Sequence, residues 1–193
     1  MQRGVHVIPH TPVTGLLRDG SRVVGVQTAT GPISAGVVLS AVGGRVSTVA
    51  AMADLRLPIR THPLQALVTN AYAQGFGPIV ASSELLCYVS QTGRGQMLMG
   101  AEFDSQPSYS LQSSYEFLQT VSTKVTHILP FLRDLRILRQ WAGICDISPD
   151  YSPIMGFTGI EGLLLTTGWG TWGFKAIPAG GEEIGRASCR ERV

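Results

Sequence analysis

Short apolar runs alternate with turn residues and predict a strand-rich first third of the chain. Branched apolar residues favour strands over residues 5–8, 13–17, 22–28 and 37–42. Asp19-Gly20, between the second and third of these strands, is a strong hairpin signal. The run 37–42 is nearly continuously apolar, which indicates a buried strand, and a short helix is expected to follow it through Met52.

The middle of the chain continues with strands and then changes to a helical pattern. Strands are expected over residues 67–72, 85–91 and 97–103. After Pro107, apolar residues recur at helical spacing, which is typical of one helix face packed on a core. The expected face consists of Leu111, Tyr115, Leu118, Val121, Val125, Ile128 and Leu129. Pro130 is expected to end this helix.

The last part combines two strands with a glycine-rich loop. Strands are expected over residues 137–147 and 163–167, with a turn over 149–153. Gly168-Trp169-Gly170-Thr171-Trp172-Gly173 follows the second strand, and a helix is expected from Phe174. A loop of this kind between a strand and a helix aims backbone N–H groups at an anionic ligand. Ordinary turn chemistry, without a ligand, is the alternative.

Composition narrows the class of protein. The chain has 193 residues, of which 44% are hydrophobic and 15% charged, so it is long enough to fold around a core. No apolar run reaches the ~18–20 residues of a membrane helix, and no secretory signal is visible, so we expect a cytoplasmic protein without membrane contact. The formal charge of +2 does not favour nucleic-acid binding, and the three cysteines lack disulfide-scaffold or zinc-site spacing, so no metal site is expected.

The end of the chain differs in character from the rest. The stretch Ile184-Gly-Arg-Ala-Ser-Cys-Arg-Glu-Arg-Val193 resembles the in-frame translation of a common sequencing-adapter oligonucleotide. We therefore expect residues 184–193 to be a non-native tail and the natural protein to continue beyond this point. A genuine basic C-terminus is the alternative. Without the tail, acidic and basic residues are equal in number.

Several motifs together resemble the C-terminal part of the D-amino-acid-oxidase-like FAD-dependent oxidoreductases. The motifs are residues 139–143 (Arg-Gln-Trp-Ala-Gly), 148–156 (Ser-Pro-Asp-Tyr-Ser-Pro-Ile-Met-Gly) and 168–176 (Gly-Trp-Gly-Thr-Trp-Gly-Phe-Lys-Ala). Within that family, the chain is most similar to the beta subunits of heterotetrameric sarcosine oxidases, a narrower match supported by residues 63–68 and 88–91.

The resemblance implies an α+β fold. A mixed or antiparallel substrate-domain sheet with flanking helices is expected beside part of an FAD domain. Residues 1–56 would form a partial FAD-binding domain, and residues 57–147 a substrate-binding sheet and helix. Residues 148–183 would return to the FAD domain with the flavin loop and a C-terminal helix, before the tail at 184–193.

The resemblance also implies a reaction, the oxidative demethylation of sarcosine by hydride transfer to FAD. The partners would be sarcosine and the other subunits of a heterotetramer, in which FMN receives the electrons from FAD. The family's Gly-x-Gly-x-x-Gly fingerprint is absent from this chain, and none of its four histidines matches the context of the one that carries FMN. A related dehydrogenase or oxidase subunit for proline or glycine, and a non-catalytic truncated remnant, remain open alternatives.

The same resemblance implies a set of cofactor-binding residues: Val13, Gly170, Thr171, Gly173 and Lys175. The two glycines let the backbone approach the flavin ring. Lys175 is expected to contact both the flavin and the substrate carboxylate, against the alternative of a solvated surface lysine. Val13 is expected to present backbone groups to the adenine. No catalytic residue is assigned.

Four further residues are candidates for the lining of a substrate pocket: His62, Tyr88, Trp141 and Tyr151. Side chains of these types are more often packed or capped in a core, so both interpretations stay open. Trp172 stands where many members of the family have glycine, and it is expected to narrow the space beside the loop.

Overall fold

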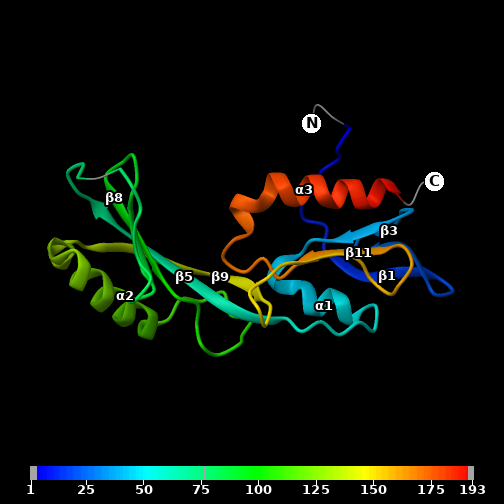
Figure 1. The fold of residues 1–193 in the computed structure, drawn as a ribbon, viewed down its shortest axis with the longest axis horizontal. Helices are drawn as coiled ribbons and strands as arrows, with labels where there is room; N and C mark the ends of the chain where they lie inside the picture. Colours follow the sequence, from blue (N-terminus) through cyan, green and yellow to red (C-terminus); the bar gives the residue numbers. More distant parts are fainter. Residues whose placement is uncertain (1–3, 76, 191–193) are drawn as a thin grey trace. The chain divides into compact units, whose positions relative to one another are not determined.

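The computed structural model describes residues 4–75 and 77–190 and has an α+β fold, as expected from the sequence. The chain divides into two compact units (Figure 1). Unit 1 combines Met1–Arg60 with Asp146–Val193, and unit 2 is Thr61–Cys145. The chain therefore leaves unit 1, builds unit 2, and returns to complete unit 1.

Unit 1 contains two small sheets. An antiparallel meander joins β1 (Val13–Asp19), β2 (Arg22–Thr28) and β3 (Gly31–Ser34). The second sheet has the order β10–β11–β4 and consists of β10 (Ile154–Phe157), β11 (Leu163–Thr167) and β4 (Val38–Ser40). In that sheet β10 and β11 are antiparallel, whereas β11 and β4 are parallel although they lie far apart in sequence.

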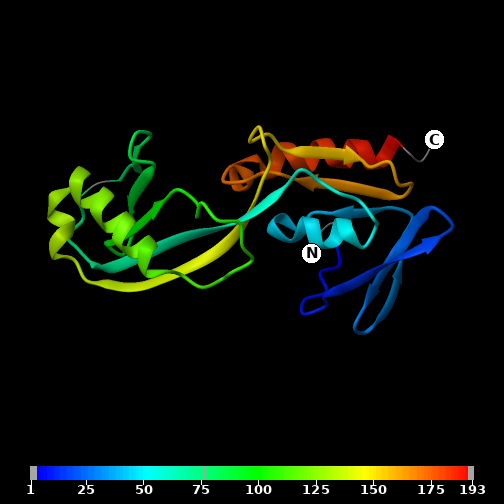
Figure 2. The same ribbon diagram turned by 90° about the horizontal axis from the view of Figure 1, so that it is seen from below.

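Helices complete unit 1. The short 3-10 turn η1 (Gly43–Arg45) leads into α1 (Val46–Ala51), directly after β4. The long helix α3 (Gly173–Arg190) follows β11 and packs on β10 and β11, alongside which it runs in Figures 1 and 2. A small buried cluster of Val23, Ala53 and Leu163 connects β2, β11 and the turn after α1.

Unit 2 is built on one larger sheet of order β6–β7–β8–β5–β9. Its strands are β5 (Arg60–Ala71), β6 (Val80–Ser82), β7 (Cys87–Gln91), β8 (Gln96–Ala101) and β9 (Ile137–Ile147). Between β8 and β9 the chain forms α2 (Tyr115–Ile128) and the 3-10 helix η2 (Pro130–Asp134). The Ser114 side chain caps α2 by accepting a hydrogen bond from the Phe117 N–H.

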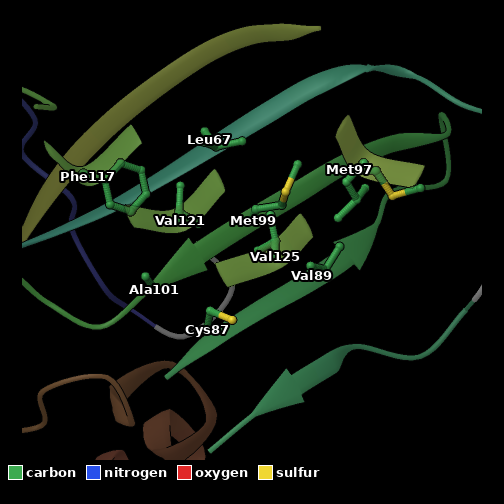
Figure 3. Close-up of a cluster of buried hydrophobic side chains, with 10 residues drawn as sticks. Leu67, Cys87, Val89, Met97, Met99, Ala101, Phe117, Val121 and Val125 are labelled. Carbon is green, nitrogen blue, oxygen red and sulfur yellow. The ribbon is translucent and has the colours of Figure 1, made fainter. Parts of the chain in front are cut away.

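Helix α2 covers one face of this sheet and closes the main core of unit 2. Phe117, Val121 and Val125 point from α2 onto Leu67, Val89 and Met99 of the strands (Figure 3). The spacing of the three helical residues places them on one stripe, as the periodicity predicts. Leu111 and Tyr115, however, are exposed, because Leu111 precedes the helix and Tyr115 opens it; placing them on the packed face was wrong.

Several other expectations differ from the structure. Residues 5–8 are not a strand, since no neighbouring strand pairs with them. The strand expected over 37–42 is shorter, and the short strands β3, β6 and β10 were not predicted. Within the described residues, no helix is long and apolar enough to span a membrane.

Candidate functional site

The glycine-rich loop connects β11 to α3 through backbone conformations that favour glycine. Gly168 and Gly170 have φ angles of +72° and +51°, in the left-handed region where a side chain is disfavoured. Gly173 needs its small size for another reason, because an added Cβ would lie 3.1 Å from the Cβ of Trp169. The three glycines of the loop thus have geometric reasons that do not depend on a ligand.

A cavity of about 460 Å³ lies beside this loop, within unit 1. Its walls come from the end of β4, the end of β9, the loop itself and one face of α3. Small residues dominate the walls, among them Ala41, Gly43, Gly170, Gly173 and Ala176. Small side chains of this kind leave room for a ligand to approach the backbone closely.

Asp146 fastens the loop at the edge of this cavity and was missed in the sequence. The residue is only 4% exposed, and its Oδ2 accepts hydrogen bonds from the Thr167 hydroxyl at 2.7 Å and the Gly168 N–H at 2.6 Å. Its main-chain oxygen accepts a third bond from the Gly170 N–H at 3.1 Å. An acidic residue within the apolar second half of the strand, residues 141–147, was the signal that could have found it.

These bonds decide which loop amides face a ligand. The N–H groups of Gly168 and Gly170 donate to Asp146, and the Trp172 N–H donates to the Trp169 oxygen at 2.9 Å. The first turn of α3, by contrast, carries N–H groups that a helix cannot pair internally. The positive end of α3, which begins at Gly173, is therefore the donor-rich part of this site.

Lys175 lies outside the cavity wall. Its side chain is exposed, and its Nζ lies 3.8 Å from the centroid of the Trp172 ring, in a cation–π contact. The neighbouring Phe174 is 90% exposed, so this side of the first helical turn is open. Trp172 thus holds the lysine near the loop, whereas Gly173 and Ala176 face the cavity from the same helix.

The remaining two residues of the predicted cofactor set also lie outside the cavity wall. Val13 begins β1 with an exposed side chain, and Thr171 is exposed at the tip of the loop. The structure therefore brings Gly170 and Gly173 to the cavity and leaves Val13, Thr171 and Lys175 around or away from it. Their roles with a cofactor stay predictions.

A larger cavity of about 650 Å³ is a weaker candidate. It is bordered by the exposed ion pair of Arg22 with Glu161 and by one side of α3. Three of its lining residues, Ile184, Gly185 and Ser188, belong to residues 184–193, which are predicted to be a non-native tail, and Ile184 also lines the smaller cavity. No residue of the glycine-rich loop 168–173 lines this cavity, which makes it the weaker candidate.

In unit 2, His62 belongs to a buried polar network. His62 Nδ1 lies 2.7 Å from the Asp104 main-chain oxygen, and its ring packs on Phe103. Gln65, which is 2% exposed, donates to both carboxylate oxygens of Asp104 at 2.9 Å and accepts from the Ser113 hydroxyl at 2.6 Å. These contacts indicate a structural role for His62.

Tyr88 lies across a glycine on the neighbouring strand. Its register partner on β8 is Gly100, and an added Cβ at Gly100 would lie 2.5 Å from the Tyr88 ring. Burial raises the pKa of the Tyr88 hydroxyl, because the interior disfavours the phenolate. Trp141 and Tyr151, the other pocket candidates, are exposed, and neither cavity described above includes any of these three aromatic residues.

Comparison with known proteins gives a consistent result. The profile of the family described as "FAD dependent oxidoreductase" matches residues 1–187. The chain is 37% identical to the sarcosine oxidase subunit beta of Arthrobacter sp. over 180 residues, which cover 93% of this chain and 44% of that subunit. The corresponding subunit of Rhizobium meliloti is 39% identical over 93% of this chain and 43% of its own length.

Solved structures agree with these sequence matches. The L-proline dehydrogenase from P. horikoshii superposes with a TM-score of 0.92 at 31% identity, over 100% of this chain and 53% of that protein. A glycine oxidase from Geobacillus kaustophilus shares the fold, with a TM-score of 0.82 at 20% identity over 93% of this chain and 48% of that protein. The chain thus spans about half the length, or less, of the proteins it matches.

Proposed function

Because the chain belongs to the family of FAD-dependent oxidoreductases, we propose that it supplies the flavin loop and the substrate-side sheet of an amine-oxidising enzyme. The observation that carries this proposal is the cavity lined by Gly170 and Gly173 beside the N-terminal end of α3. The full enzyme would be longer than this chain, since the matched relatives extend well beyond the aligned part.

The residues of the cavity fit a flavin. Glycine and alanine side chains leave the backbone accessible to a flat ring, and the first turn of α3 offers N–H donors to an electron-rich edge. The positive end of the helix would favour negative charge on the ring. Gly170 would contribute space only, because its N–H is already bonded to the Asp146 oxygen.

Bound FAD would accept a hydride from the carbon next to the substrate amine. The task of this chain would be to orient that carbon, and Lys175 would bind the substrate carboxylate as a point charge. An exposed cation–π contact contributes only about 0.5–1 kcal/mol, so a carboxylate competes readily for the lysine now lying on Trp172. Trp172 and Phe174 would then limit the access of water to the first turn of α3.

Sarcosine is the proposed substrate, and oxidative demethylation the proposed reaction. The support is the similarity to two sarcosine oxidase beta subunits at 37% and 39% identity over most of this chain. As a beta subunit, the complete protein would assemble with the other subunits of a heterotetramer. FMN would receive the electrons in that complex, held by a part of the enzyme outside this chain.

Oxidation of proline is the second candidate reaction. The similarity to L-proline dehydrogenase, at 31% identity with a TM-score of 0.92, favours it. Proline is also a secondary amine with a carboxylate, so Lys175 would serve in the same way. The two candidates differ in the bulk that must fit beside Trp172, where sarcosine demands less room than the proline ring.

The test measures flavin reduction by each substrate. A polypeptide of the length of the relatives, carrying these residues, is purified with FAD and mixed anaerobically with sarcosine, L-proline or glycine, and the bleaching of flavin absorbance is followed. We expect sarcosine to reduce the flavin fastest. Faster reduction by proline would replace the first candidate with the second, and absence of reduction by all three would contradict amine oxidation.

The role of Lys175 is tested in the same assay. Lys175→Met should lower the reduction rate at least tenfold while leaving the stability almost unchanged, because the side chain is exposed. The matched control is Lys124→Met, since Lys124 pairs with Glu102 at 2.6 Å in unit 2 and has no role in the proposal. Equal rates for Lys175→Met and the unsubstituted protein would remove the lysine from the reaction.

A further inference from the structure

We propose that Asp146 is the positioning residue of the glycine-rich loop, and that its carboxylate tunes the electron affinity of the flavin held beside it. The effect on the flavin rests on the proposed function. The positioning of the loop concerns only the residues of this chain. Asp146 is the last residue but one of β9, and it lines the same cavity as Gly170 and Gly173.

Three hydrogen bonds from one residue fix the start of the loop. The carboxylate Oδ2 receives the Thr167 hydroxyl and the Gly168 N–H, and the main-chain oxygen receives the Gly170 N–H. Two of the three bonds go to a carboxylate, and bonds of that type are shorter and stronger than bonds between neutral groups. Asp146 therefore holds both left-handed glycines of the loop, Gly168 and Gly170.

The buried carboxylate of Asp146 should also act electrostatically on a ring in the cavity. Thr167 is fully buried and Asp146 is nearly so, which means that water screens the carboxylate poorly. A negative charge in the cavity wall disfavours added negative charge on a ring within the cavity. Asp146 should thus make the flavin harder to reduce, opposing the helix end that favours reduction.

The contrast between two substitutions separates positioning from charge. Asp146→Asn keeps an oxygen that accepts the Thr167 and Gly168 bonds but removes the charge. Asp146→Ala removes both the acceptor and the charge. Asp150→Asn is the matched control, because Asp150 is an exposed carboxylate on the adjacent turn and forms its hydrogen bonds with Ser148 and Ser152 of that turn.

Three measurements on the longer polypeptide carry the test: hydrogen exchange of the loop amides, FAD affinity by equilibrium dialysis, and the flavin reduction potential. Asp146→Ala should accelerate exchange at Gly168 and Gly170 at least tenfold and weaken FAD binding at least tenfold. Asp146→Asn should change exchange and affinity less than threefold, yet move the reduction potential to a more positive value. Asp150→Asn should change none of the three.

Unchanged exchange in Asp146→Ala would overturn the positioning role. The link to the flavin would be overturned if Asp146→Ala accelerated exchange but neither Asp146 variant changed the FAD affinity or the reduction potential. Should Asp146→Ala fail to fold, Thr167→Val removes one of the two carboxylate bonds with little change in volume, and it should accelerate exchange at Gly168. If the unsubstituted polypeptide binds no FAD, the proposed function fails, and the exchange data alone decide the positioning role.

Discussion

Units 1 and 2 differ in the size of their buried apolar clusters. In unit 2, α2 closes a continuous core over the sheet, with Phe117, Val121 and Val125 all buried. In unit 1 the buried cluster of Val23, Ala53 and Leu163 is much smaller. Large apolar residues are exposed in both units, so the size of the buried cluster is what separates them. Unit 2 therefore has the larger packed core, whereas the glycine-rich loop of unit 1 depends on backbone geometry.

The largest expected effect comes from removing the centre of the α2 core. Phe117→Ala should lower the free energy of unfolding by about 3–5 kcal/mol, because the ring is 5% exposed and a cavity would remain. Chemical denaturation measures the loss. Tyr115→Ala, two residues earlier and 72% exposed, is the control and should change stability by less than about 0.5 kcal/mol. Similar losses in both variants would contradict the assignment of the core face.

The polar network of unit 2 should rank next. Gln65→Leu preserves volume but leaves the Asp104 carboxylate and the Ser113 hydroxyl without their partner, at a cost of about 1–3 kcal/mol. Denaturant midpoints of this variant and of the exposed control Gln112→Leu give the comparison. A neutral Gln65→Leu would mean that the network adds nothing to the apolar packing.

In unit 1, backbone geometry should determine how a glycine substitution changes stability. Gly168→Ala places a side chain at φ +72° and 3.2 Å from the Ser152 oxygen, which should cost about 1–3 kcal/mol. Gly181→Ala, in open space on α3, should instead stabilise the chain by about 0.4–1 kcal/mol, because alanine restricts the unfolded chain. Thermal unfolding measures both changes. A loss of stability in Gly168→Ala and a gain in Gly181→Ala would confirm that backbone geometry, and not burial, determines the need for glycine in the loop.

A smaller effect is expected at the cation–π pair. Lys175→Met should cost no more than about 0.5–1 kcal/mol, as expected for an exposed contact with an aromatic ring. The difference in tryptophan emission between Lys175→Met and the unsubstituted chain reports the change, because the ammonium group lies on the Trp172 ring and the other two tryptophans are the same in both proteins. Emission that is the same in Lys175→Met and in the unsubstituted chain would show that the pair does not persist in solution.

The smallest effect concerns alkaline pH in unit 2. Burial raises the pKa of Tyr88 and of the Cys87 thiol above their ordinary values. Both groups bind their protons more tightly in the folded state than in the unfolded state. Their contribution to the free energy of unfolding is therefore complete below the pKa of the unfolded state and is lost as the pH rises through the pKa of the folded state. Stability should thus fall above about pH 9. The loss from the thiol should come first and the loss from the phenol at higher pH, because a thiol has the lower ordinary pKa. Tyr88→Phe should reduce the loss at the higher pH, and denaturation at several pH values tests it.

The sequence predicted the long or strongly patterned elements well. The bounds of β2, β9 and β11 match the prediction, because their apolar runs are delimited by clear turn residues. Residues 5–8 have the composition of a strand, but a strand also requires a paired neighbour, and composition does not reveal one. The helical stripe was extended too far at Leu111, since periodicity does not locate the cap that Ser114 provides.

At the candidate site, the glycine pattern located the loop but not its contacts. The sequence predicts a glycine-rich loop after the strand, and the structure adds the left-handed conformations of Gly168 and Gly170 and places Gly170 at a cavity. The side-chain position of Lys175 depends on the Trp172 rotamer, which no spacing encodes. Asp146 escaped notice because its partners, Thr167 and Gly168, lie far along the chain.

The contact of Tyr88 with Gly100 has a consequence for how this protein can diverge. A Cβ at position 100 would lie 2.5 Å from the ring, so the ring would have to shift or the tyrosine would have to change. A smaller residue at position 88 would in turn leave space beside position 100, so that position would no longer require glycine. We therefore expect positions 88 and 100 to vary together across relatives, with glycine opposite the aromatic ring and larger residues opposite small ones.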